Sequence, residues 1–187
     1  MKTAEADILF VPGFRGSEPE HWQARWLAKL STARWLTGMD VNRASKADWV
    51  GALVAATAQA TRPVVIIAHS IGVIATAHAA PQLKGVAGAF LVGLSDWERP
   101  NLLPGVEHDF APIPRDPLPF PSLLVASRTD PYCDFDRAED FSYAWGSSLV
   151  DAGDAGHINV ASGHGPWPEG LMRLAGFLPK LPVPGAS

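Results

Sequence analysis

The fold is decided by residues 63–72, which read Pro-Val-Val-Ile-Ile-Ala-His-Ser-Ile-Gly. The first six of these residues form an unbroken apolar run with β-branched side chains, which is typical of a central strand in a parallel sheet. Residues 71–80 follow with a helical pattern that ends before Pro81. Ser70 is therefore expected at a turn between a buried strand and a helix.

The turn has the form small-x-Ser-x-Gly, with Ala68 and Gly72 on either side of Ser70. Between a strand and a helix, this motif holds a nucleophilic serine on a strained backbone above the sheet. Small residues are needed because the strand and the helix approach closely, and Ala68 adds one methyl group where glycine is usual. The amide of Ile71, at the helix N-terminus, is then expected to donate to a developing oxyanion. The alternative is that Ser70 only caps the helix, a common role of serine.

Similar short apolar runs alternate with helical patterns along the whole chain. Strands are expected at residues 8–11, 34–38, 63–68, 86–94, 122–126 and 148–152. Helices are expected at residues 20–30, 46–60, 71–80, 134–144 and 165–177, with Ser45 as the candidate N-cap of the second. This alternation predicts right-handed βαβ units, and therefore an α/β fold in which a compact parallel sheet carries helices on both faces.

Length and composition favour one globular domain over residues 1–187, with 1–6 and 179–187 expected as frayed tails. A formal net charge of -4 and the lack of a Lys/Arg-rich run argue against a nucleic-acid partner. No apolar stretch approaches the ~20 residues that span a bilayer, and the first apolar run lacks the basic flank of a signal peptide. With Cys133 as the single cysteine, these features predict a cytoplasmic protein without an internal disulfide or a membrane partner.

A serine nucleophile needs a base, and four histidines follow Ser70 in the chain, namely His78, His108, His157 and His164. His78 lies well inside the helix that Ser70 opens, which points it away from the turn, and His108 follows no strand. His157 comes just after the last strand in a glycine-containing loop and is the expected base. His164 lies nearer the last helix and remains the alternative.

The base in turn needs a carboxylate that orients it. Asp130 directly follows the strand at residues 122–126, and Pro131 restrains it to extended backbone geometry. The spacing between Asp130 and His157 leaves room for one helix and one strand, as expected for adjacent βα units. Asp130 is therefore the expected acid, and Asp96, which follows the preceding strand, is the alternative.

A second oxyanion donor is expected from residues 11–16, Val-Pro-Gly-Phe-Arg-Gly, which follow the first strand. Because glycines let the backbone approach a substrate closely, the amide of Phe14 is expected to pair with that of Ile71. The amide of Arg15 is a weaker candidate, and a plain glycine turn is the alternative. The Arg15 side chain is also a candidate for the substrate pocket, where it would bind a carboxylate, unless it is simply a surface arginine.

Seven segments of the chain form a specific combination: VPGFRGS (11–17), EHWQARW (20–26), AHSIG (68–72), FPS (120–122), ASRTDPY (126–132), GHIN (156–159) and SGHGPWPEG (162–170). Together they resemble the retinoblastoma-binding-protein-nine-like serine hydrolases, a family that includes bacterial YdeN-like esterases. The resemblance implies an α/β-hydrolase fold without a lid domain and with neither a metal nor an organic cofactor. It also implies a triad of Ser70, Asp130 and His157, the same three residues that the strand ends favour.

The resemblance further implies that His21 and Trp22 lie near the mouth of the substrate pocket, since they follow the oxyanion loop. The helical spacing of Trp22 and Trp26 instead favours a place in the core on one helix face. Trp167, at the start of the last helix, is expected to support the loop of His157.

These residues predict a serine hydrolase that acts on esters, or on thioesters or amides, of small acyl groups through an acyl-enzyme. A small ester or acyl compound is the expected partner. Because the short chain has no room for a lid insertion, residues 97–119 are the expected cover of the site. An apolar pocket is expected there, lined by Trp97, Leu102, Leu103 and Phe110. The alternative function is a protein-interaction module on a hydrolase scaffold with weak or no catalysis.

Overall fold

The computed structural model describes residues 1–182 and contains one six-stranded parallel sheet in the order β2-β1-β3-β4-β5-β6. The strands are β1 (Asp7–Val11), β2 (Ala33–Trp35), β3 (Val64–His69), β4 (Val86–Val92), β5 (Ser122–Ala126) and β6 (Ser148–Asp151). The helices are α1 (Trp22–Leu27), α2 (Lys46–Ala58), α3 (Ile71–Ala79), α4 (Phe135–Trp145) and α5 (Pro168–Phe177). Throughout this described part, every helix lacks the length and apolar character needed to cross a membrane.

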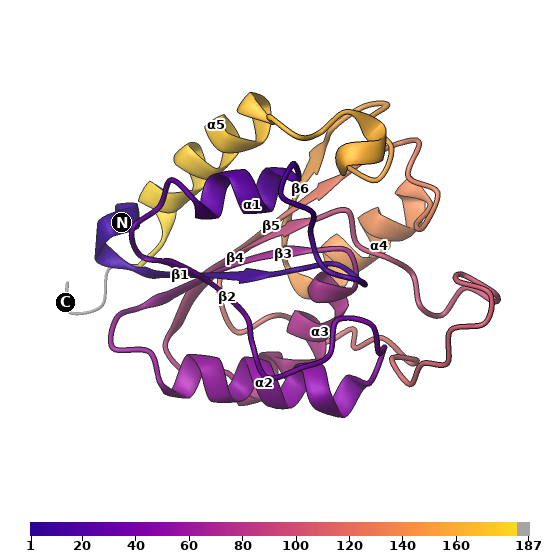
Figure 1. The fold of residues 1–187 in the computed structure, drawn as a ribbon, viewed down its shortest axis with the longest axis horizontal. Helices are drawn as coiled ribbons and strands as arrows, with labels where there is room; N and C mark the ends of the chain where they lie inside the picture. The colour runs from indigo at the N-terminus through magenta and orange to yellow at the C-terminus, as the bar shows by residue number, and fades with distance from the viewer. Residues whose placement is uncertain (183–187) are drawn as a thin grey trace.

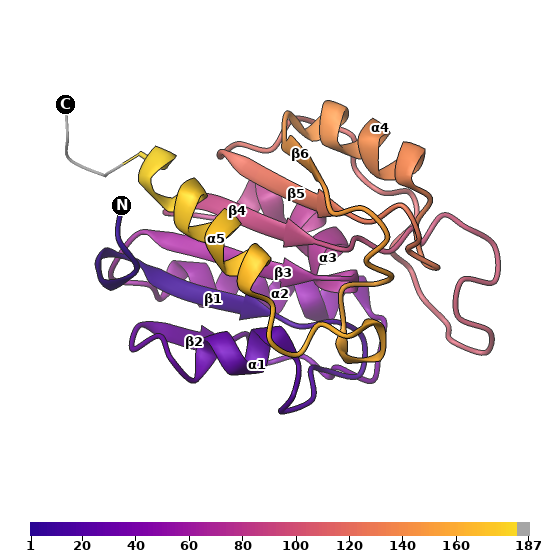
Figure 2. The ribbon, with the colours of Figure 1, turned by 90° about the horizontal axis from the view of Figure 1, so that it is seen from above.

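Helices cover both faces of the sheet, α1 and α5 on one side and α2 and α3 on the other (Figures 1 and 2). Successive side chains of β3 point to opposite faces. Val65 and Ile67 therefore pack with residues of α1 and α5, whereas Val64 and Ile66 pack with residues of α2, α3 and α4. Burial on both faces explains the unbroken apolar run of β3 and confirms the expected α/β-hydrolase architecture, with no lid inserted within residues 1–182.

Several element boundaries differ from those that the pattern predicts. Helix α1 covers Trp22–Leu27 instead of 20–30, because the chain is extended at His21, which occupies the N-cap. Helix α5 begins at Pro168 instead of residue 165, since a residue that precedes proline is disfavoured in the helical conformation. Strand β2 is shorter than expected and ends at Trp35. The predicted N-cap of α2 is confirmed, because the Ser45 side chain accepts from the Asp48 amide.

The N-terminal residues, expected to fray, are instead packed against the sheet. Thr3–Glu5 form a 3-10 helix that is held by a hydrogen bond of 2.8 Å from the Lys2 amide to the Glu5 carboxylate. Ala6 is fully buried. At the other end Leu178–Lys180 form a further 3-10 helix and Leu181 is buried, while the rest of the expected tail, residues 183–187, lies outside the described residues.

The order of the strands places a crevice beside β1. The chain runs from β1 through α1 to β2 and then returns through α2 to β3, which lies on the opposite side of β1. The two connecting helices therefore lie on different faces of the sheet (Figure 2). Ligands of such sheets bind beyond the carboxyl ends of the strands at this switch point. Val11 and Ala68 are paired at that edge, which brings the loop after β1 next to the turn after β3.

Candidate active site

Ser70 lies on a strained turn between β3 and α3. Its backbone has φ 57° and ψ -123°, a region that residues other than glycine rarely adopt. Gly72 is required at this turn, because a Cβ atom there would lie 2.7 Å from the carbonyl oxygen of Pro12. Although Ser70 occupies the N-cap position of α3, its side chain makes no capping hydrogen bond. The capping alternative for Ser70 is therefore wrong.

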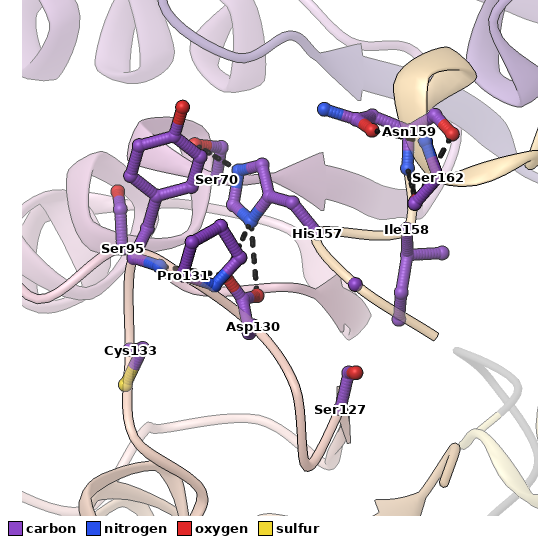
Figure 3. A network of polar contacts seen from close by, with 12 residues as sticks. Ser70, Ser95, Ser127, Asp130, Pro131, Cys133, His157, Ile158, Asn159 and Ser162 are labelled. Carbon is purple, nitrogen blue, oxygen red and sulfur yellow. Dashed lines mark hydrogen bonds and ion pairs between the residues drawn. The ribbon is translucent and has the colours of Figure 1, made fainter. Parts of the chain in front are cut away.

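The side chains of Ser70, His157 and Asp130 form one hydrogen-bonded chain (Figure 3). His157 Nε2 lies 2.9 Å from Ser70 Oγ, and His157 Nδ1 lies 2.9 Å from each carboxylate oxygen of Asp130. Asp130 Oδ1 also accepts from the Tyr132 amide at 2.9 Å. With its Nδ1 proton directed to Asp130, a neutral His157 leaves Nε2 as the acceptor for the Ser70 hydroxyl. This is the geometry of a nucleophile, a base and an orienting acid.

The alternative acid and bases lie in other contacts. Asp96 accepts from Arg137 Nε at 2.9 Å, in an ion pair at the start of α4. His164 Nδ1 lies 3.2 Å from Ser162 Oγ. His78 is half-buried, and its Nε2 lies 2.8 Å from the carbonyl oxygen of Phe110.

The loop that carries His157 is held by side chains from distant parts of the chain. His69 Nε2 donates to the carbonyl oxygen of His157 at 2.9 Å, and Trp22 Nε1 donates to that of Ile158 at 2.9 Å. Ile158 has φ 48°, an unfavourable value for a β-branched residue. These two donors therefore stabilise a strained turn directly at the proposed base.

Two hydroxyl groups after β5 hold the preceding part of the same loop. Ser127 Oγ accepts from the Ala155 amide at 2.9 Å, and Thr129 Oγ1 accepts from the Gly156 amide at 3.1 Å. Because Asp130 comes directly after Thr129, the same strand end positions both Asp130 and the loop that carries His157.

The loop after β1 approaches Ser70 closely. A Cβ atom on Gly13 would lie 3.3 Å from Ser70 Cβ. The amide of Arg15 donates to the carbonyl oxygen of Val41 at 2.8 Å, which removes it as the second oxyanion donor. Among residues 1–182 the amide of Phe14 has no such backbone partner, and Ile71 opens α3, where the first amides lack intrahelical acceptors. The geometry therefore leaves Phe14 and Ile71 available as the donor pair.

A cavity of about 370 Å³ opens over Ser70. Its apolar wall comes from residues 97–119, here called the cover loop, and consists of Trp97, Leu102, Leu103, Pro104 and Val106. Phe110, expected in this wall, is instead fully buried in the core. Trp97 is 2% exposed, and its Nε1 donates to Ser95 Oγ at 2.8 Å, which fixes the indole at the base of the wall.

Two of the residues expected at the pocket, His21 and Arg15, lie there, whereas Trp22 does not. His21 and Arg15 both line the cavity, and the Arg15 guanidinium extends over the Phe14 ring at 5.5 Å. Trp22 does not lie at the pocket mouth, because its indole is fully buried against Trp26 and Trp167. The helical spacing thus placed Trp22 correctly in the core, and the location implied by the resemblance is wrong.

Two further histidines, His69 and His21, lie in a row next to His157. The ring of His69 lies 4.8 Å from that of His157 and 4.9 Å from that of His21, measured between centroids. Burial, reinforced by His157 and His21, lowers the pKa of His69 well below its usual value. Burial, reinforced by His157 and His164, lowers the pKa of His21 to about 4. Both rings are therefore uncharged near pH 7 and act through hydrogen bonds.

Sequence reasoning missed His69, Gln23 and Asn159, the last of which lines the cavity. Gln23 is fully buried, and its Nε2 donates to the carbonyl oxygens of Val11 and Ile67 at 3.0 and 3.1 Å, which ties the start of α1 to the ends of β1 and β3. The signal for His69 was a polar residue that ends an otherwise apolar strand. For Gln23 and Asn159 the sequence carried no signal beyond their presence next to His21 and His157.

Comparison with known proteins places this geometry in a family. The sequence matches the serine hydrolase family over residues 8–176. A YdeN-like hydrolase from Pectobacterium atrosepticum is 38% identical and superposes with a TM-score of 0.83, covering 94% of this chain and 91% of that one. No curated protein sequence matches significantly.

More distant structures share the fold alone. The ydeN gene product of B. subtilis is 18% identical with a TM-score of 0.72, over 92% of this chain and 98% of that one. Esterase 2 of Thermogutta terrifontis is 17% identical with a TM-score of 0.65, over 96% of this chain and 85% of that one. The chain belongs to the serine hydrolase family and is an enzyme with the α/β-hydrolase fold, which confirms the resemblance drawn from its motifs.

Proposed function

We propose that the chain hydrolyses esters of small acyl groups, with Ser70 as nucleophile, His157 as general base and Asp130 as the acid that orients the base. The observation that carries the proposal is the unbroken chain of 2.9 Å contacts from Ser70 Oγ through both nitrogens of His157 to Asp130. A serine in an ordinary helix cap needs neither the strained backbone of Ser70 nor this partner.

The reaction proceeds by acyl transfer. His157 Nε2 accepts the Ser70 proton as Oγ attacks the ester carbonyl, and the amides of Phe14 and Ile71 donate to the resulting oxyanion. His157 then donates the same proton to the departing alcohol oxygen, which leaves Ser70 acylated. A water molecule, activated by His157 in turn, releases the carboxylic acid and restores the serine.

The apolar wall of the cover loop supports a preference for short acyl chains. Leu102, Leu103 and Val106 form an apolar wall on one side of the cavity of about 370 Å³, and a short acyl group can pack against this wall close to Ser70. We therefore expect kcat/KM for p-nitrophenyl esters to fall once the acyl chain exceeds the length of the cavity. Equal values for acetate and dodecanoate esters would contradict this preference.

The test of the mechanism is Ser70→Ala, compared with the wild type on a panel of short esters. Removal of the nucleophile is expected to lower kcat by roughly 10⁴-fold or more. A fluorophosphonate probe should modify the wild type on the peptide that contains Ser70 and leave the variant unmodified. A folded wild-type protein that neither hydrolyses esters nor reacts with the probe would favour the alternative of a protein-interaction module.

A further inference from the structure

His21 places an unused hydrogen-bond donor in the cavity. The side chain is only 3% exposed and lines the space above Ser70. Its Nδ1 accepts from the Gln23 amide at 3.2 Å, so this nitrogen carries the lone pair. A neutral imidazole has one proton, which must then reside on Nε2. The low pKa of His21, about 4, keeps the ring in this neutral state near pH 7.

The Nε2–H of His21 makes no hydrogen bond within residues 1–182. In the same part of the chain every fully buried side-chain nitrogen or oxygen atom has a partner. The Nε2 atom is therefore accessible, and the cavity over Ser70 is the space that His21 lines. The proposed ester hydrolysis uses the amides of Phe14 and Ile71 and the ring of His157, and it leaves this donor without a function.

The position of His21 is fixed by its two neighbours. Trp22 donates to the Ile158 carbonyl in the loop of His157, and Gln23 donates to carbonyl oxygens at the ends of β1 and β3. Trp22 and Gln23 thus fasten the start of α1 to the elements that carry Ser70 and His157. A donor held in this way is preorganised for a ligand atom.

The chemistry of the reaction decides which part of a substrate meets His21. His157 returns its proton to the departing alcohol oxygen, so the alcohol portion must lie on the His157 side of Ser70. The His21 ring is linked to that side through His69, with centroid distances of 4.9 and 4.8 Å. Asn159 also lines the cavity there, and because its Oδ1 accepts from the Ser162 amide, its Nδ2 remains as a second donor. The aliphatic side chains of the cavity come from the cover loop instead.

We infer that His21 Nε2, supported by Asn159, binds the alcohol portion of the substrate, and that this portion carries an acceptor oxygen near the ester. The substrate class is an ester of a short apolar acid with a polyol or ether-type alcohol. The inference rests on the proposed function of Ser70 and His157 and adds to it the identity of the leaving group.

The experiment compares two acetate esters of equal size, 2-methoxyethyl acetate and butyl acetate, which differ by an oxygen in place of a methylene group. In the wild type the ratio of their kcat/KM values is expected to exceed the ratio for hydroxide-catalysed hydrolysis. His21→Phe keeps a ring but has no donor and is expected to lower this ratio by about 3- to 10-fold, the effect of one neutral hydrogen bond. His21→Ser also lacks the donor in the cavity but retains a capping hydroxyl for α1, and should lower the ratio equally.

Leu103→Ala is the matched control, because it alters the apolar wall without touching the donors. It should change the acyl-length preference and leave the ratio of the two acetates unchanged. A ratio that is the same in the wild type, His21→Phe and His21→Ser would overturn the inference, as would a change in His21→Phe alone, which would assign the effect to the lost cap. Failure of the proposed function is separately visible, because hydrolysis would then survive Ser70→Ala.

Discussion

The two ends of the Ser70–His157 contact are built in different ways. Ser70 is positioned by the backbone, through a strained turn that Gly72 permits and through the close approach of Gly13. His157 is positioned by side chains, since the rings of His69 and Trp22 donate to the carbonyl oxygens of its turn. The backbone contacts at Ser70 are contacts between elements of the central sheet and the helix that follows β3. The hydrogen bonds at His157 instead join segments that are far apart in the sequence.

This difference predicts which substitutions lower the stability of the fold and which lower the rate of the reaction. A change at the turn of Ser70 must disturb β1, β3 and α3 together, because their backbones meet there. Replacing a side-chain donor of the His157 loop leaves these backbone contacts in place and is expected to displace His157. Displacement of a reacting group by ~1 Å can lower a rate by ~100-fold without unfolding the protein.

The largest effect is expected for Gly72→Ala. The new Cβ atom would lie 2.7 Å from the Pro12 carbonyl oxygen and 2.9 Å from the Val11 carbonyl oxygen, and these backbone atoms cannot move without shifting the end of β1. We expect the free energy of unfolding to fall by about 3 kcal/mol, as in an overpacked core. Urea denaturation measures this change.

Gly51→Ala provides the matched control for Gly72→Ala. Gly51 lies in α2, is exposed, and nothing lies within 4 Å of an added Cβ atom. There alanine should increase the free energy of unfolding by about 0.5–1 kcal/mol, since glycine is a poor helix former. If both substitutions change stability in the same direction, the backbone contact at Gly72 does not constrain the turn.

The contrast between the two ends also explains what the sequence could predict. Ser70, Asp130 and His157 each follow a strand, and parallel strands bring their carboxyl ends to one edge, so a strand pattern was sufficient to bring them together. The strand-end argument applies equally to Asp96, and only the spacing to His157 and the presence of Pro131 favoured Asp130. In the structure Asp96 is paired with Arg137 instead.

The donors of the His157 loop could not be predicted in this way. Trp22 and Ile158 are 136 positions apart, and their hydrogen bond depends on the indole orientation within a packed core. The apolar spacing of Trp22 and Trp26 indicated burial but not a polar function for the indole nitrogen. The ordered structure of residues 1–6 could not be predicted for a similar reason, since it depends on distant contacts such as the hydrogen bond of 2.8 Å from Thr32 Oγ1 to the Thr3 carbonyl and on the burial of Ala6.

A smaller effect on stability, with a clear effect on rate, is expected for Trp22→Phe. The substitution removes the donor to the buried Ile158 carbonyl, an unsatisfied group that costs about 1–3 kcal/mol. Because the turn at Ile158 then loses its support, kcat should fall by on the order of 10-fold while KM changes little. Urea denaturation and steady-state kinetics with a short ester measure the two effects.

Trp26→Phe is the matched control for Trp22→Phe. Trp26 stacks on Trp167 with centroids 5.6 Å apart, and its indole nitrogen makes no hydrogen bond within residues 1–182. Both substitutions remove the same volume from one aromatic cluster, so the difference between them isolates the hydrogen bond. Equal losses of kcat in the two variants would show that the cluster supports His157 only by packing.

The last effect is a change in the pH dependence of stability and is expected for His69→Phe. The fold keeps His69 neutral, because burial and the neighbouring His157 and His21 lower its pKa, whereas the unfolded chain takes up a proton near pH 6.5. The free energy of unfolding is therefore fully retained above pH 6.5 and falls as the pH drops below it, by roughly 1.4 kcal/mol per pH unit for this group. His21 adds to the same loss between pH 6.5 and about 4.

In His69→Phe the contribution of this ring is absent, so stability between pH 6.5 and 5 should decline less steeply than in the wild type, by roughly 1.4 kcal/mol per pH unit. At pH 7.5 the same variant should be the slower enzyme, because the His157 carbonyl has lost its donor. Urea titrations at several pH values, with Trp22→Phe as a variant that changes no titrating group, separate the two effects. Parallel pH profiles for His69→Phe and the wild type would show that His69 becomes protonated without unfolding, and its hydrogen bond to the His157 carbonyl would then not require a neutral ring.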